Sequence, residues 1–123
     1  MISHMSIGVR DVAKAGRFYD AALAPLGGKR LYDSAEALGY GTASPTLWVM
    51  KCGAPFAPND SSGLHICFDA PSRAAVDQFH SAAMGAGARD NGKPGLRKDY
   101  GDNYYAAFVV DPDGYRLEAY CAR

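Results

Sequence analysis

The sequence predicts an α+β fold made of two βαβββ modules, whose curved mixed sheets form a cup with helices on the outer face. Two observations support this prediction. The chain resembles itself when it is shifted by 61 positions, so that His4 falls on His65 and Phe18 falls on Phe79. In both copies, the alternating pattern of a strand is followed by the pattern of an amphipathic helix.

The length of 123 residues predicts a single domain, divided into module one (1–51), a linker (52–62) and module two (63–123). A module of about 60 residues has only a marginal core by itself. The two modules are therefore expected to bury their apolar faces together, within one chain or in a homodimer. A hydrophobic fraction of 48% is typical of a globular protein and not of a disordered one.

Charge and cysteine content argue against several kinds of partner and site. Thirteen basic and thirteen acidic residues cancel, so no nucleic-acid partner is expected. No apolar stretch has the length of a membrane span, and the first residues do not resemble a signal peptide. The three cysteines lack close CxxC spacing, which argues against a disulfide framework and a zinc ribbon. The sequence therefore predicts a reduced, cytoplasmic protein.

Module one is predicted to begin with a strand over residues 2–9, where apolar and polar positions alternate. Asp11 is a suitable N-cap for a helix over 12–24, and Pro25 ends that helix. Short runs separated by turn-forming residues then predict three strands, at 29–33, 37–42 and 46–51.

Module two repeats this order after a linker that is rich in proline and polar turn formers. A strand is predicted at 64–69 and a helix over 72–86, for which Ser72 is the N-cap. A long loop rich in Gly, Lys, Asp and Asn is predicted over 91–103. The last strands are predicted at 104–110 and 115–121, joined by the turn Asp111-Pro112-Asp113-Gly114.

Three residues with metal-binding side chains are predicted to share one face of the sheets. His4 and His65 occupy equivalent positions of the two modules, and Glu118 lies in the last strand. Every second residue of that strand is apolar and suited to pack under a helix, namely Leu117, Ala119 and Cys121. Because side chains alternate along a strand, Glu118 and both histidines are expected to point into the cup. A lone histidine is more commonly structural, but two imidazoles with a carboxylate favour a site for Mn, Fe, Ni or Zn with open positions.

Further side chains are predicted to contact a small-molecule substrate in the cup. Leu47-Trp48-Val49 matches Leu117-Glu118-Ala119, so Trp48 stands where a second acid could lie. Trp48 is expected to form a wall of the cup, with packing in the core as the alternative. His80, on the second helix, is assigned a surface or packing role. The candidates for substrate binding are Trp48, Met50, Tyr105, Arg116 and Tyr120.

The predicted loop at 91–103 has cationic and phenolic side chains in it or beside it. Such groups could hold an anionic substrate, and a solvated loop is the alternative. The residues concerned are Arg97, Lys98, Tyr100, Asn103, Tyr104 and Tyr105.

Three segments of the sequence resemble a known family when they are taken together. They are residues 4–11 followed by Phe18-Tyr19, residues 64–66, and residues 111–118. This pattern resembles the vicinal oxygen chelate superfamily, which includes glyoxalase I, bleomycin resistance proteins, fosfomycin resistance proteins and extradiol dioxygenases. The resemblance covers essentially the whole chain and implies paired βαβββ modules, frequent dimers and a divalent metal in the cup. The metal positions that it implies are His4, His65 and Glu118.

Differences from individual members narrow the activity that the resemblance implies. Glyoxalase I is similar but has a fourth ligand, an acid at the place of Trp48, which argues against glyoxalase I activity itself. Fosfomycin thiol transferases resemble this chain at that place, with two histidines, a glutamate and a tryptophan. Extradiol dioxygenases share the ligand set but have a further catalytic histidine without an assigned counterpart here. Bleomycin-type binders lack the three ligands, which this chain has.

The leading hypothesis is a glyoxalase-like, metal-dependent enzyme that acts on a small oxygenated molecule. Glu118 would be a ligand and a catalytic group, and Arg116 and Tyr120 would orient it or the substrate. Lyase, isomerase, dioxygenase and thiol transferase chemistry all stay open. The cup could close within one chain, or His4 of one chain could meet His65 and Glu118 of another in a homodimer. The alternative is a resistance or sequestration protein without catalysis, with stacking surfaces from Trp48, Tyr40, Tyr105 and Phe108.

Overall fold

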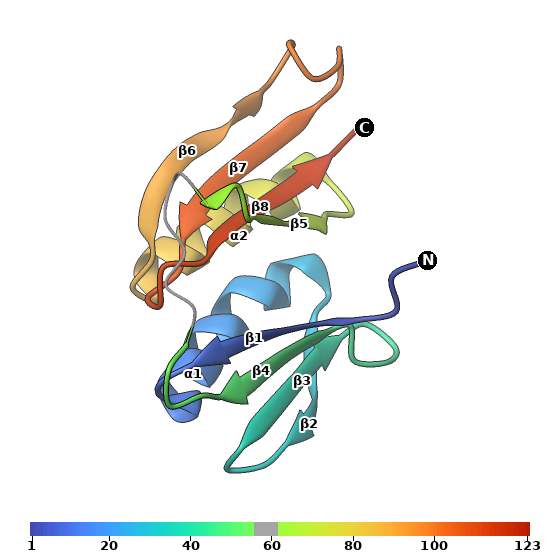
Figure 1. Ribbon diagram of the computed structural model, residues 1–123. Coiled ribbons are helices and arrows are strands. Elements are labelled where there is room, and N and C mark those ends of the chain that lie inside the picture. Colours follow the sequence, from blue (N-terminus) through green and yellow to red (C-terminus); the bar gives the residue numbers. More distant parts are fainter. Residues whose placement is uncertain (56–61) are drawn as a thin grey trace.

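Module one folds as a strand, a helix and three further strands, as the sequence predicts. The computed structural model describes residues 1–55 and 62–123, so most of the predicted linker lies outside the described residues (Figure 1). The sheet of module one has the strand order β1-β4-β3-β2, with β1 parallel to β4 and the other neighbours antiparallel. Its elements are β1 (Met5–Val9), α1 (Val12–Leu23), the 3-10 turn η1 (Ala24–Leu26), β2 (Lys29–Asp33), β3 (Ala37–Gly41) and β4 (Leu47–Lys51).

Module two has the same element order and the same sheet topology as module one. Its strand order is β5-β8-β7-β6, again with the first strand of the module parallel to the last. Its elements are β5 (Ile66–Asp69), α2 (Arg73–Gly85), β6 (Arg89–Leu96), β7 (Tyr105–Val110) and β8 (Arg116–Cys121). The duplicated βαβββ architecture that the repeat predicts is therefore confirmed.

The predicted loop at 91–103 is wrong over its first half, because β6 extends to Leu96 and pairs with β7. Two glycines and a proline in this stretch suggested a loop. They are tolerated because β6 is the edge strand of its sheet, where a missing N–H costs little. The register with β7 shifts around Gly92, whose φ is 149°, and again before Gly95. Only the turn from Arg97 to Tyr104 remains outside the strands.

Both helices begin at the residues that the sequence predicts. The Asp11 side chain accepts a hydrogen bond from the Lys14 N–H at 3.0 Å, and Ser72 Oγ accepts one from the Ala75 N–H at 3.1 Å. Each cap satisfies a backbone donor that the first helical turn would leave without a partner. In the part of the chain described, no helix has the length and apolarity needed to cross a membrane.

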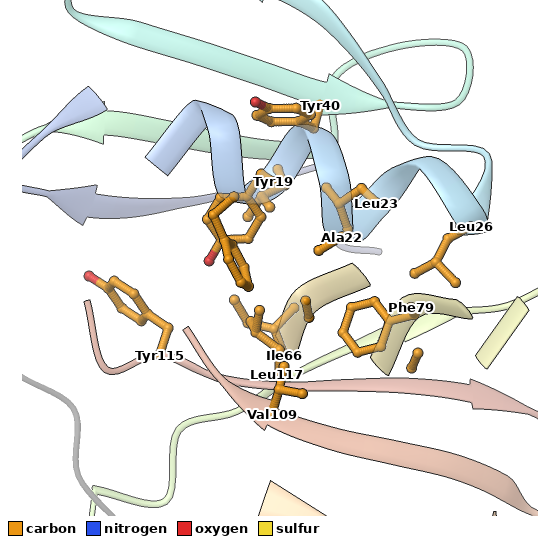
Figure 2. Packing of buried hydrophobic residues seen from close by; sticks show 14 of the residues in the cluster. Tyr19, Ala22, Leu23, Leu26, Tyr40, Ile66, Phe79, Val109, Tyr115 and Leu117 are labelled. Carbon is orange, nitrogen blue, oxygen red and sulfur yellow. The ribbon is translucent and has the colours of Figure 1, made fainter. Parts of the chain in front are cut away.

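The core lies between the two sheets and joins the modules. Figure 1 shows α1 and α2 in the layer between the sheets, and the two helices contact each other. In Figure 2, Tyr19 and Ala22 of α1 meet Phe79 of α2 and Leu117 of β8, all of them buried in one cluster. Each sheet therefore has one face covered by a helix and an opposite face, the open face, without one. The two open faces lie on opposite sides of the molecule, so they do not close one cup within a chain.

Polar contacts fasten the modules to each other beside this core. The Tyr19 hydroxyl in α1 donates a hydrogen bond to the carboxylate of Asp111, which is only 4% exposed. Asp111 also accepts from the backbone N–H groups of Asp113 and Tyr115, at 2.9 and 2.8 Å. The Tyr115 hydroxyl in turn donates to the Gly8 carbonyl at 2.7 Å. The predicted Asp-Pro-Asp-Gly turn is thus also a contact between modules.

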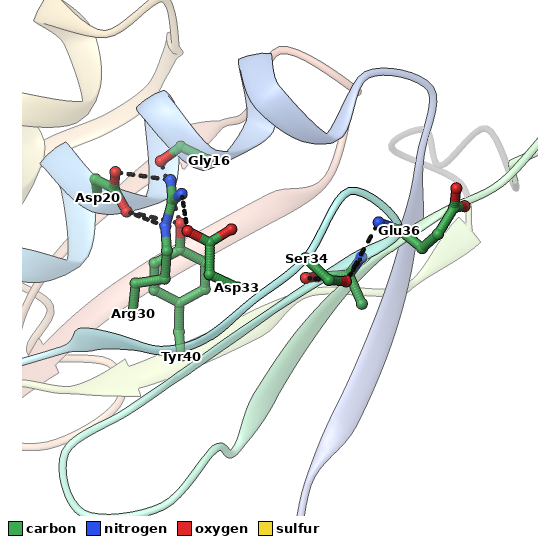
Figure 3. A network of polar contacts seen from close by, with 8 residues as sticks. Gly16, Asp20, Arg30, Asp33, Ser34, Glu36 and Tyr40 are labelled. Carbon is green, nitrogen blue, oxygen red and sulfur yellow. Dashed lines mark hydrogen bonds and ion pairs between the residues drawn. The ribbon is translucent and has the colours of Figure 1, made fainter.

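A polar network on module one attaches β2 and β3 to α1 (Figure 3). The Arg30 guanidinium donates to both carboxylate oxygens of Asp20, at 3.0 and 2.8 Å. The Tyr40 hydroxyl donates to Asp20 at 2.8 Å and lies 3.1 Å from the Gly16 carbonyl. Gly16 leaves the room for this network, since a Cβ there would lie 2.4 Å from Arg30 Nη2.

Candidate functional site

Glu118 is a buried acid on the open face of the second sheet. Its neighbours in β8, Leu117 and Ala119, are buried on the helix side, so the alternation of the strand turns Glu118 the other way. The sheet register places it between Cys67 of β5 and Phe108 of β7. Its exposed fraction is 3%, which is unusual for a carboxylate and requires polar partners.

The two carboxylate oxygens of Glu118 have different partners. Oε1 lies 3.0 Å from Nε2 of His65, the residue immediately before β5. Oε2 accepts a hydrogen bond of 2.5 Å from the Tyr104 hydroxyl. Loss of hydration and the adjacent carboxylate raise the pKa of Tyr104, so the phenol stays protonated and acts as a donor. Tyr104 therefore holds one oxygen of Glu118 and leaves the other beside the imidazole.

Cys67 is a protonated thiol at neutral pH. Loss of hydration, followed by the charge of Glu118, raises the pKa of Cys67 to about 12. A thiol with such a pKa is a weak nucleophile near pH 7, because the thiolate is the reactive form. The site therefore offers an imidazole and a carboxylate, with an unreactive thiol on the neighbouring strand β5.

A cavity of about 680 Å³ lies beside Glu118 and His65. Three aromatic side chains line it, those of Tyr100, Tyr104 and Phe108. Arg116, Asn91 and Asp99 supply polar groups to the same cavity. Its volume and mixed lining are typical of a pocket for a small molecule.

The structure brings together two of the three predicted metal ligands. His65 and Glu118 are in contact, whereas His4 belongs to module one and is exposed before β1. His4 Nδ1 forms a hydrogen bond of 3.0 Å with Ser3 Oγ. Over residues 1–55 and 62–123, no three His, Cys, Asp or Glu side chains gather into a group that could hold a metal. The two histidines occupy equivalent positions of the modules, but each lies one residue before the first strand and not within it, because β1 begins at Met5 and β5 begins at Ile66.

Trp48 occupies in module one the place that Glu118 occupies in module two. It pairs with Ser6 of β1, just as Glu118 pairs with Cys67 of β5. The indole lies on the open face of the first sheet, half-buried, with its ring 5.2 Å from that of Tyr32. Met50 follows on the same face and is exposed. Within one chain, these two predicted substrate contacts are separate from the Glu118 cavity.

The remaining predicted substrate contacts differ in position. Arg116 lines the Glu118 cavity, whereas Tyr120 is not among its lining residues and has its ring 4.3 Å from that of Tyr104. Tyr105 is on the helix side of the sheet, where its hydroxyl donates to Asp77 of α2 at 2.6 Å. Its predicted place in the cup is therefore wrong, because the register Phe108–Glu118 puts odd-numbered residues of β7 under the helix.

Tyr40 also differs from its predicted role as a stacking surface, since it is 1% exposed and lies beside α1. His80 has the packing role that was expected, with Nε2 2.9 Å from Asp90 Oδ1.

Tyr104 and Asn91 belong to the site without being predicted in that role. Tyr104 is predicted as the first residue of a strand and as a possible contact for an anionic substrate, but not as a partner of Glu118, although its alternation with Phe108 places it on the face of Glu118. That signal was present in the sequence. Asn91 could not be found because the strand that carries it, β6, was not predicted.

Comparison with known proteins identifies the family. Residues 1–119 match the model of the Glyoxalase/Bleomycin resistance protein/Dioxygenase superfamily, and the chain belongs to this superfamily. A glyoxalase/bleomycin resistance protein from Albidiferax ferrireducens T118 is 29% identical, with a TM-score of 0.81 over 96% of this chain and 95% of that one. No curated protein matches significantly.

More distant solved structures share the fold. A putative glyoxalase from Bacillus halodurans is 24% identical, with a TM-score of 0.74 over 98% of this chain and 94% of that one. The fosfomycin resistance protein FosX from Mesorhizobium loti is 18% identical, with a TM-score of 0.72 over 98% of this chain and 90% of that one. The predicted family and fold are thus confirmed.

Proposed function

We propose that this protein is a metal-dependent enzyme that acts on a small oxygenated molecule. The observation that carries the proposal is the contact of 3.0 Å between His65 Nε2 and Glu118 Oε1, on the open face and beside a cavity. A buried carboxylate next to an imidazole is the beginning of a two-histidine, one-carboxylate site. Superfamily members generally use divalent metal ions and bind small-molecule substrates.

The donor set fits a divalent ion when two chains are combined. One chain supplies His65 and Glu118 together but keeps His4 in the other module. The open face of module one, which carries Trp48, is free to lie against the open face of module two in a second copy. In such a homodimer, His4 of one chain completes the ligand set of the other. The exposed apolar residues Tyr32 and Met50 on that face support this association.

The residues around this site have separate roles in the proposed reaction. His65, Glu118 and the second chain's His4 hold the ion, which when bound would act as a Lewis acid on substrate oxygens. Tyr104 fixes the Glu118 carboxylate through Oε2. Arg116 and Glu118 face the cavity and orient the substrate. The divalent ion is Mn, Fe, Ni or Zn, since imidazole and carboxylate suit all four.

The reaction is a lyase, isomerase, dioxygenase or thiol transferase step. Trp48 supports the choice against glyoxalase I activity, because an indole can neither bind the ion nor transfer a substrate proton in the place of an acid. Dicarbonyls, epoxides and catechols are therefore the compounds to screen. Turnover of one of them, detected by mass analysis, assigns the subtype.

A second candidate function is binding of a small molecule without catalysis. The aromatic lining of the Glu118 cavity favours it, as does the separation of His4 from the other two ligands within a chain. This function predicts a bound compound that leaves the protein chemically unchanged. Detection of a product by mass spectrometry contradicts it.

Elemental analysis of protein purified without chelators tests the metal site. We expect about one divalent ion per chain in the wild type, and loss of that ion in His65→Ala and in His4→Ala. His80→Gln is the matched control, because His80 binds Asp90 and lies apart from Glu118. Absence of metal from the wild type after incubation with each of the four ions overturns the proposal. Sedimentation of the same samples checks the homodimer.

A further inference from the structure

Tyr100 is an exposed aromatic residue that a rigid turn presents to the Glu118 cavity. Its exposed fraction is 67%, yet the turn that carries it is closed by several backbone hydrogen bonds. Arg97 N–H donates to the Tyr104 carbonyl at 2.7 Å, and Tyr100 N–H donates to the Arg97 carbonyl at 2.9 Å. An exposed phenol ring on such a turn is preorganised for contact, since little conformational freedom is lost when a ligand covers it.

The ring of Tyr100 is one end of a series of tyrosines. It stands edge-on to Tyr104, with 5.3 Å between the ring centroids and 66° between the planes. Tyr104 packs in turn on Tyr120 at 4.3 Å and is fixed at its hydroxyl by Glu118. Tyr104, the middle ring of the series, is therefore held by a ring on each side and by the buried acid of the site.

Phe108 adds a third aromatic ring to the lining of the cavity. The Arg97 guanidinium lies over this ring, 5.4 Å from its centroid, and is held there by the carbonyls of Gly95 and Lys93 at 2.9 and 2.7 Å. Phe108 is thus as well fixed as the tyrosines. Fixed aromatic rings favour flat partners, because offset and edge-to-face contacts with a π system add to the burial of apolar surface.

The charges around the cavity indicate a neutral ligand. Of the described residues that line it, Asp99 and Glu118 are acidic and Arg116 is basic, so no excess of positive charge attracts an anion. Each oxygen of the Glu118 carboxylate has two lone pairs, so it can accept a hydrogen bond beyond those from His65 and Tyr104. A hydroxyl group is the neutral donor that such an acid receives.

We propose that the cavity binds a planar, hydroxylated aromatic molecule, with its ring against Tyr100 and Tyr104 and its hydroxyl group donating to Glu118. The volume of about 680 Å³ accommodates a ligand of one or two fused rings. This inference deepens the proposed function, because it names the ligand class of the same cavity. The ring contacts come from Tyr100 and Tyr104, which are not among the proposed metal ligands, so the preference for an aromatic ring can be tested on metal-free protein.

The test is calorimetric titration of the metal-free protein with 2-naphthol and with its fully saturated counterpart, decahydro-2-naphthol. Both have a hydroxyl group and two fused rings, but only the first is flat and aromatic. We expect 2-naphthol to bind about tenfold more tightly, the scale that aromatic contacts supply. Tyr100→Leu should lose about tenfold in affinity for 2-naphthol, whereas the matched variant Tyr100→Phe should stay within about twofold.

Equal binding of the two compounds, no binding of either, or an unaffected Tyr100→Leu overturns the inference. Thermal unfolding of each variant confirms that it is folded, which an exposed position favours. Metal bound without any preference for the aromatic compound leaves the proposed enzyme standing and removes its ligand class. If the protein prefers the aromatic compound but binds no metal, the ligand class stands, the proposed metal-dependent enzyme is removed, and binding without catalysis is supported.

Discussion

At the scale of single residues, the central feature of the site is that the two carboxylate oxygens of Glu118 have different partners. A carboxylate that is 3% exposed needs polar partners for its oxygens, because burial removes its contacts with water. The Tyr104 hydroxyl fixes Oε2 from one side, and Oε1 then remains directed at His65. The geometry of the site therefore depends on a phenol that is not one of the proposed metal ligands.

Removal of that phenol hydroxyl tests its role in holding the carboxylate. We expect Tyr104→Phe to weaken the binding of Mn²⁺ or Zn²⁺ by about tenfold to a hundredfold, the range for groups that orient metal ligands. Tyr120→Phe is the control, because it removes one hydroxyl from the same pair of tilted, contacting rings without affecting the bond to Glu118. Calorimetric titration measures both affinities, and an unchanged Tyr104→Phe would contradict the role.

At the scale of elements, local sequence patterns predict a helix or strand correctly where its tertiary contacts favour the same structure. The caps at Asp11 and Ser72 predicted both helix starts, and alternation predicted which face of β8 carries Glu118. The edge strand β6 was missed because its glycines and proline are ordinary loop residues when pairing is unknown. Tyr105 lies on the helix side because it is three residues from Phe108 in β7, and side chains at odd separations along a strand point to opposite faces.

Two glycines test how strongly the elements constrain the backbone. At Gly41, the end of β3, an added Cβ would lie 1.9 Å from the carbonyl oxygen of Ser44, which no side-chain rotation relieves. We expect Gly41→Ala to lower the free energy of unfolding by about 3 kcal/mol or more. Gly85 ends α2 with open space around it, so Gly85→Ala should raise that free energy by about 0.5 kcal/mol. Urea denaturation measures both changes in unfolding free energy, and equal changes would contradict the steric difference between the two positions.

At the scale of the whole molecule, the modules share one core and are further joined through the Asp-Pro-Asp-Gly turn. The repeat in the sequence predicted that the modules would pack together, but periodicity alone could not say that both helices would lie between the sheets. The arrangement of the modules could not be predicted, and of the three predicted ligands only His65 and Glu118 are in contact, whereas His4 is not. Contact between His65 and Glu118 follows from neighbouring strands of one sheet, whereas the place of His4 depends on how modules are arranged.

The bond from Tyr19 to Asp111 tests the coupling between modules. Burial raises the pKa of Asp111, while the Tyr19 hydroxyl acts against that shift by stabilising the ionised form. Loss of the hydroxyl in Tyr19→Phe should cost about 2 kcal/mol of unfolding free energy at pH 7, typical for a bond to a charged group. The cost should shrink as the pH falls through the pKa of Asp111, because a neutral carboxyl group accepts a weaker bond.

Chemical denaturation provides the measurement for Tyr19→Phe. Trp48 fluorescence follows module one, and far-ultraviolet circular dichroism follows both modules, so coincident transitions are expected from one shared core. Tyr32→Phe, at a residue that is 48% exposed, serves as the control and should change the free energy by less than about 0.5 kcal/mol. If the loss of unfolding free energy in Tyr19→Phe does not change with pH, the contribution of the Tyr19 hydroxyl does not depend on the charge of Asp111, and the prediction is wrong.

Because the two open faces lie on opposite sides of the molecule, inactivating mutations placed in different chains of a dimer should be able to complement each other. In the proposed twofold dimer there would be two sites, each with His4 from one subunit and both His65 and Glu118 from the other. A hybrid of a His4→Ala chain with a Glu118→Gln chain gathers both defects into one site and leaves the second intact. Two inactive proteins should therefore regain activity when they exchange subunits, up to half of the wild-type value per hybrid dimer. Such complementation cannot occur if each site belongs to a single chain.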